Sequence, residues 1–200
     1  MSDFLHYFSL GFIKITYQDV FINTLFIIAL CGIYTFKSIR LIATYAGCFV
    51  FGYLTTFFLS AFEIINVPIK LLQYLLPLTT IVVSISNFFL KKNAFTNKYS
   101  PHDYRYFLAL AGGLLHGLNF PEAIETALRS DKLLLPILAF NVGILSALLV
   151  IILFLLITAF IVTYLFRVNI REWNLILSGG CAGISIYIIM NALFHTLALK

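Results

Sequence analysis

His116 is the residue of this sequence best suited to chemistry in an apolar environment. It stands in Gly113-Leu-Leu-His-Gly117, and Asn119 follows three residues later. An imidazole in such a place either binds a metal or joins neighbouring helices through hydrogen bonds. For hydrogen bonds the best candidates are Asn87, Asn141 and Tyr53 of other apolar stretches, and a metal site would also use Asn23 and Asn119. The structural role is the more common one for a lone histidine, and the metal ligand is the alternative.

Other familiar functional motifs are absent from the sequence. It contains no phosphate-binding loop, dinucleotide-binding turn, zinc-protease motif or evident nucleophile–base pair. We therefore expect neither enzymatic activity nor a cofactor. Two glycine pairs, Gly113 with Gly117 and Gly179 with Gly183, have the spacing that lets membrane helices approach closely. They predict helix packing rather than chemistry.

The composition indicates a membrane protein. Of the 200 residues, 62% are hydrophobic and 10% are charged, whereas soluble domains carry about 25% charged residues. The thirteen basic residues are scattered between apolar runs, so they form no patch for nucleic acid. These numbers exclude a soluble enzyme and predict an all-α transmembrane bundle with lipid around it.

Apolar runs without charge predict the positions of the helices. Six spans result: 20–36, 41–62, 71–90, 106–120, 140–166 and 173–198. The fifth run begins at Leu133, and it either tilts strongly or has its first turns, Leu133–Ala139, at the membrane interface. We favour the interface, because Pro136 suits a first helical turn and a break more than a position in mid-membrane. The pattern of Phe4, Leu5, Phe8 and Phe12 predicts a short interfacial helix at the N-terminus. No charged residue is expected deep in any span.

The basic residues predict the orientation of the spans, because cytoplasmic loops are enriched in Lys and Arg. One side carries a net charge of −1 and contains both termini, whereas the other carries +6. The basic residues of the positive side are Lys37, Arg40, Lys91, Lys92, Lys98, Arg105, Arg167 and Arg171. We therefore expect a multi-pass protein of the bacterial inner membrane with both termini outside the cytoplasm.

Several motifs, in their order, resemble the HupE/UreJ family of hydrogenase and urease accessory membrane proteins, which are regarded as nickel permeases. Gly113-Leu-Leu-His-Gly-Leu-Asn-Phe120 is similar to a family F-G-L-I-H-G-L-G-F motif, and Leu138-Ala-Phe-Asn-Val-Gly143 is similar to its following L-x-F-N-x-G. Tyr7-Phe-Ser-Leu-Gly-Phe12, Leu25-Phe26 and Tyr34-Thr-Phe-Lys37 resemble the start of the family pattern. The resemblance extends roughly from Phe4 to Phe166 and implies the family's membrane fold.

The sequence departs from this family at most of the positions that the resemblance assigns to metal ligands. His, Asp, Glu and Gln residues of the family are replaced here by Lys14, Ile22–Asn23, Tyr53, Ser86, Leu145 and Leu148. Only His116 remains, and nickel(II) prefers four or more N or O donors. We therefore expect no bound metal and predict an accessory or structural subunit held against other integral membrane proteins. The alternative is a divalent-metal permease with a rebuilt site of His116, Asn119, Asn87, Asn141, Asn23 and Tyr53.

Overall fold

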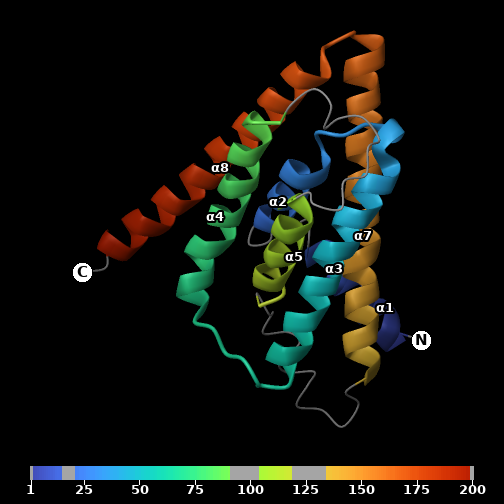
Figure 1. Ribbon diagram of the computed structural model, residues 1–200. Helices are drawn as coiled ribbons and strands as arrows, with labels where there is room; N and C mark the ends of the chain where they lie inside the picture. Colours follow the sequence, from blue (N-terminus) through green and yellow to red (C-terminus); the bar gives the residue numbers. More distant parts are fainter. Residues whose placement is uncertain (1, 15–20, 91–103, 119–133, 199–200) are drawn as a thin grey trace.

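Every element of the described chain is a helix, as the composition predicts (Figure 1). The computed structural model describes residues 2–14, 21–90, 104–118 and 134–198. The helices are α1 (Ser2–Lys14), α2 (Phe21–Cys31), η2 (Phe36–Ser38), α3 (Ile39–Ala61), α4 (Ile69–Phe88), α5 (Tyr104–His116), α7 (Leu134–Phe160), the π-helical turn η4 (Ile161–Leu165) and α8 (Ile170–Ala198). Within these ranges, four helices are long and apolar enough to cross a membrane: α3 with η2, α4, α7 with η4, and α8.

The two remaining predicted spans are short helices. Helix α2 has 11 residues and α5 has 13, which gives about 16 and 20 Å of length at 1.5 Å per residue. The predicted span 20–36 is therefore wrong in its last third, because α2 ends at Cys31 and the chain is extended at Thr35. Gly32 and Thr35 carry no charge, so hydropathy gives no sign of this ending.

Helix α7 corrects a second expectation. It runs without interruption from Leu134, and Pro136 lies in its first turn, where the missing proline N–H removes no helical hydrogen bond. The expected first helical turn at Pro136 is confirmed, but no break follows it, and residues 134–139 belong to the same helix as the span. Hydropathy detects the long apolar run but not the continuity of its backbone.

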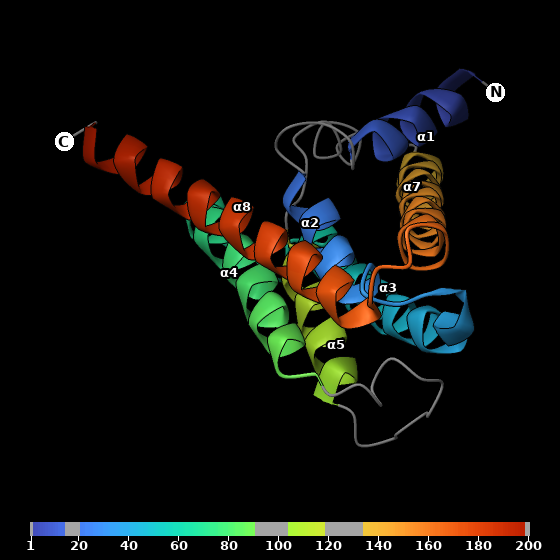
Figure 2. The same ribbon diagram turned by 90° about the horizontal axis from the view of Figure 1, so that it is seen from above.

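The helices form three closely packed pairs around α2: α3 with α5, α4 with α8, and α1 with α7 (Figures 1 and 2). Glycines set the closest contacts of two pairs. A Cβ at Gly113 would overlap the carbonyl of Phe49 on α3, and one at Gly143 would overlap the carbonyl of Phe8 on α1. Helix α2 contacts α3, α4, α5, α7 and α8. It is therefore the central element that joins the pairs.

The predicted glycine pairs differ in their surroundings. A Cβ at Gly117 would overlap Tyr53 and Thr56 on α3, whereas a Cβ at Gly179 or Gly183 would meet no atom of the described chain within 4 Å. Gly113 and Gly117 thus lie in a helix contact of this molecule. Packing at Gly179 and Gly183 stays a prediction.

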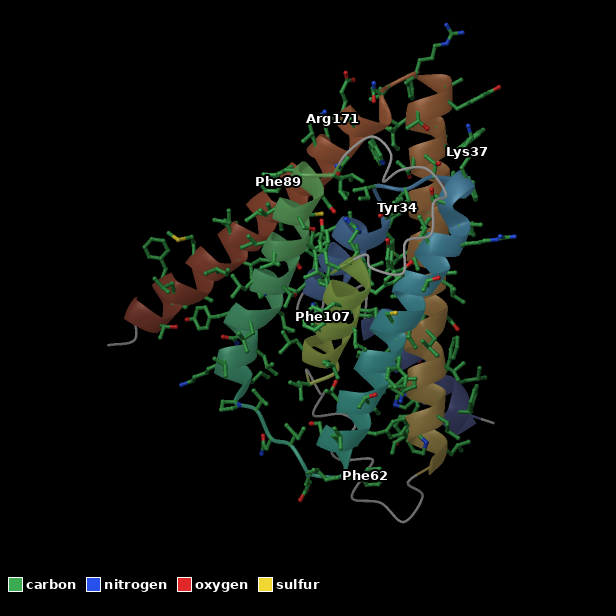
Figure 3. All side chains as sticks on the ribbon, viewed as in Figure 1. Tyr34, Lys37, Phe62, Phe89, Phe107 and Arg171 are labelled. Atoms are coloured by element: carbon green, nitrogen blue, oxygen red, sulfur yellow. The ribbon has the colours of Figure 1, made fainter. Side chains whose placement is uncertain are left out.

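The helix ends near one end of the bundle carry four of the basic side chains that the sequence places on one side, whereas Lys91, Lys92 and Lys98 lie outside the described residues. Lys37 and Arg171 both lie at the end of the bundle opposite Phe62 (Figure 3). Arg40 is in the first turn of α3, and Arg167 lies between η4 and α8. The structure therefore places these four basic residues together, and their cytoplasmic location stays a prediction.

Candidate functional site

His116 is the last residue of α5 and is fully buried. Its Nδ1 bonds to Oδ1 of Asn23 on α2, and its Nε2 lies 3.2 Å from Oγ1 of Thr79 on α4. A neutral imidazole has one N–H, and an amide oxygen can only accept. When Nδ1–H donates to Oδ1 of Asn23, Nε2 accepts from the Thr79 hydroxyl, whose single hydrogen is shared with the Leu76 carbonyl 2.6 Å away. His116 thus joins three helices.

Aromatic rings enclose this imidazole. The ring centroid of Phe26 lies 4.8 Å from that of His116, and the centroid of Phe49 lies 5.8 Å away. Phe26 in turn packs over Gly112, where a Cβ would overlap its ring. The glycine one turn before His116 therefore makes room for the ring that covers it. Phe26 and Phe49 thus give the imidazole apolar neighbours beside its two hydrogen-bond partners.

The predicted hydrogen-bond partners of His116 make other contacts instead. Asn141 donates to the carbonyl of Ile137 in its own helix at 2.8 Å, and Tyr53 stacks between Phe49 and Phe57. Asn87 binds a different cluster, and Asn119 lies outside the described residues. The expectation that Asn87, Asn141 or Tyr53 would hold His116 is therefore wrong. Thr79 takes that role, and hydroxyls are too common in the apolar runs to have marked it in the sequence.

A small, largely apolar pocket lies beside the histidine. Its walls come from α2, α3 and α7: Asn23, Thr24, Ile27, Phe49, Tyr53, Ile144, Leu148 and Ile151. Two of the predicted site residues, Asn23 and Tyr53, thus share one pocket. Among the described residues, no three His, Cys, Asp or Glu side chains come together as a possible metal site. The polar groups available to a guest here are amide and hydroxyl groups.

A second polar cluster, which the sequence did not reveal, surrounds Asn87. Its side-chain amide donates to the Ala29 carbonyl at 2.8 Å and to Oγ of Ser178 at 2.9 Å. Its backbone carbonyl accepts from Asn174 at 2.8 Å, and the Asn174 side chain accepts from Ser178. The cluster thus ties α4 to α2 and α8.

Arg105 also belongs to this cluster, and its position corrects the expectation that this basic residue lies in a loop on the positive side. It is the second residue of α5 and is 1% exposed, whereas the sequence places it in a loop. Its guanidinium donates to Oδ1 of Asn87 and to the Leu30 carbonyl, and it lies 5.4 and 5.5 Å from the ring centroids of Tyr34 and Tyr45. Hydropathy begins the span one residue after Arg105, so it assigns the charge to the loop. A buried charge in a membrane protein is costly, and it is therefore a candidate for a functional site.

The sequence model of the family described as HupE / UreJ protein matches residues 1–196 of this chain. The chain belongs to the HupE/UreJ family. This family is associated with accessory or transport roles rather than catalysis. No curated protein and no solved structure gives a significant match. The match extends over the whole described bundle, so both polar clusters lie within the family region of this HupE/UreJ chain, which is a membrane protein.

Proposed function

We propose that this chain is a non-transporting HupE/UreJ protein, an accessory or structural subunit of a membrane protein assembly in the bacterial inner membrane. The bonding of His116 carries the proposal. Both ring nitrogens have partners in Asn23 and Thr79, and Phe26 and Phe49 cover the ring. A metal ion could bind the imidazole only after one of these hydrogen bonds broke.

The chemistry of the neighbouring groups supports the same conclusion. Nickel(II) is held by several imidazole, carboxylate or similar donors, and a dehydrated cation inside a bilayer needs strong partners. Tyr53, Leu145 and Leu148 stand at positions where the resemblance places such donors. Tyr53 and Leu148 line the pocket beside Asn23 with apolar neighbours. The pocket is thus a poor path for a divalent cation.

The outer surface of the bundle supports a role in assembly. In α8, 17% of the most apolar window is buried in the described structure, against 33–44% in the other three long helices. The outward side of α8 includes Ile176, Tyr187 and Phe194. Lipid covers such a surface in a lone protein, and helices of other membrane proteins would cover it in an assembly.

One observation favours a permease as the second candidate. The N-terminus of α2 and the C-terminus of α5 meet at Asn23 and His116, and both helices are too short to span a bilayer. Transporters build substrate sites where interrupted helices end near the middle of the membrane. A permease would use His116 and Asn23 first, with Tyr53 across the pocket.

Elemental analysis and nickel uptake by proteoliposomes test the two candidates. We expect the purified protein to hold no stoichiometric nickel, cobalt or zinc, and its liposomes to take up Ni²⁺ no faster than protein-free ones. About one metal per chain, lost in His116→Ala but kept in His195→Ala, would refute the proposal in favour of a permease. His195 is a suitable control because it is exposed near the end of α8. Purification in native nanodiscs should yield a membrane protein partner at constant stoichiometry, and a homogeneous chain without one would contradict the accessory role.

A further inference from the structure

The C-terminal end of α2 receives side-chain donors from three other helices. Asn87 of α4 donates to the Ala29 carbonyl at 2.8 Å, Arg105 of α5 donates to the Leu30 carbonyl at 2.9 Å, and Trp173 of α8 donates to the Gly32 carbonyl at 2.8 Å. The last carbonyls of a helix have no partners within it, and leaving them unpaired away from water is costly. These three donors therefore form one cap on α2.

Arg105 lies at the centre of this cap. It also donates to Oδ1 of Asn87, and its guanidinium packs against the rings of Tyr34 and Tyr45. A guanidinium is always positively charged, and the C-terminus of a helix carries a partial negative charge. Arg105 thus connects the start of α5 to the end of α2 both by hydrogen bonding and by electrostatic attraction.

Helix α5 is fastened to α2 at both of its ends. Arg105 fastens the first turn, and the bond from His116 to Asn23 fastens the last one, about 16 Å further along. Between them, α5 packs on α3 through glycines. A Cβ at Gly52 would overlap the Leu110 carbonyl, and one at Gly113 would overlap the Phe49 carbonyl. Side chains of the two helices also meet near the first turn of α5, where the ring centroids of Tyr45 and Tyr106 are 5.0 Å apart.

We propose that the Arg105-centred cap is a latch that holds α5 against α2 and thereby keeps His116 closed to water and to solutes. When the cap is intact, α5 stays in the position in which Asn23 and Thr79 both reach the imidazole. When the cap is broken, α5 shifts on the glycines of α3, and the histidine becomes reachable. The latch deepens the proposed function, and rests on it, because that function requires a closed His116.

Modification of histidines by diethyl pyrocarbonate, read by mass spectrometry on the full chain in detergent, tests the latch. His6 and His195 are exposed and act as internal references, whereas His116 is fully buried. In Arg105→Gln we expect the rate at His116, relative to these references, to rise about tenfold, because one net hydrogen bond of about 1.4 kcal/mol corresponds to that factor. Arg40→Gln is the matched control, since Arg40 is an exposed arginine near the same end. It should leave the rate at His116 unchanged.

A folded Arg105→Gln protein with an unchanged rate at His116 would overturn the latch, as would an equal rise in Arg40→Gln. If Arg105→Gln does not fold, Trp173→Phe becomes the test of the latch. It removes the N–H that donates to the Gly32 carbonyl and keeps an aromatic ring at this position. We then expect a rise of about threefold from the loss of a weaker bond, and no change overturns the proposal. Nickel uptake by the wild-type chain would refute the proposed function alone, since the latch is measured by the difference between variants.

Discussion

Replacing His116 by leucine tests whether the imidazole holds the bundle together. Leucine fills a similar volume among Phe26 and Phe49 but makes neither hydrogen bond of the imidazole. We expect His116→Leu to lower the free energy of unfolding, because a buried polar group that loses its partner costs about 1–3 kcal/mol. His116→Gln should be milder, since its amide can still bond to Asn23 or Thr79.

The contacts of Thr79 and Asn23 narrow the expected loss of unfolding free energy in His116→Leu. Thr79 has a second acceptor, the Leu76 carbonyl at 2.6 Å, so its hydroxyl keeps a partner when the imidazole is gone. Asn23 is half-buried beside the pocket, and His116 is the partner that its side-chain oxygen would lose. The loss therefore falls mainly on one amide, and we expect about 1–2 kcal/mol for His116→Leu.

Unfolding in mixed micelles, followed by circular dichroism, measures this difference. His195→Leu is the matched control because His195 is exposed on α8, so the same substitution there should change stability by less than about 0.5 kcal/mol. Equal stability of His116→Leu and His116→Gln would refute the reasoning. The hydrogen bonds of His116 would then contribute nothing, and the residue would serve a pathway rather than the packing.

The remaining predictions concern the glycines and the topology. Gly113→Ala should destabilise the bundle by about 1–3 kcal/mol, because its Cβ would overlap the Phe49 carbonyl. Gly180→Ala on α8 should be tolerated, because no described atom lies within 4 Å of its Cβ, and equal losses in the same unfolding assay would contradict the packing of α5 on α3. In intact cells, an impermeant thiol reagent should label Ser2→Cys and spare Asn97→Cys, because we expect the positive side to be cytoplasmic. Labelling of Asn97→Cys from outside would reverse the topology.

The sequence alone determined the class of this protein. An apolar composition with few charges indicates a membrane protein, whose backbone groups must be satisfied within helices or closed barrels, and the long uninterrupted apolar runs favour helices. The long apolar runs also located α3, α4, α7 and α8, whose charged residues lie near their ends. The order of several motifs, including the one around His116, suggested the HupE/UreJ family, and the family match confirmed it.

Tertiary structure decided the partners of each polar group. The short length of α2 follows from Gly32 and the extended Thr35, neither of which changes hydropathy. Thr79 reaches His116 and Asn87 reaches Arg105 because of the way α4 packs against α2, α5 and α8. Sequence spacing gives the face of one helix but not the neighbour that covers it. For that reason a charge read as part of a loop, Arg105, proved to be buried at the junction of four helices, where its partners come from segments distant in the sequence.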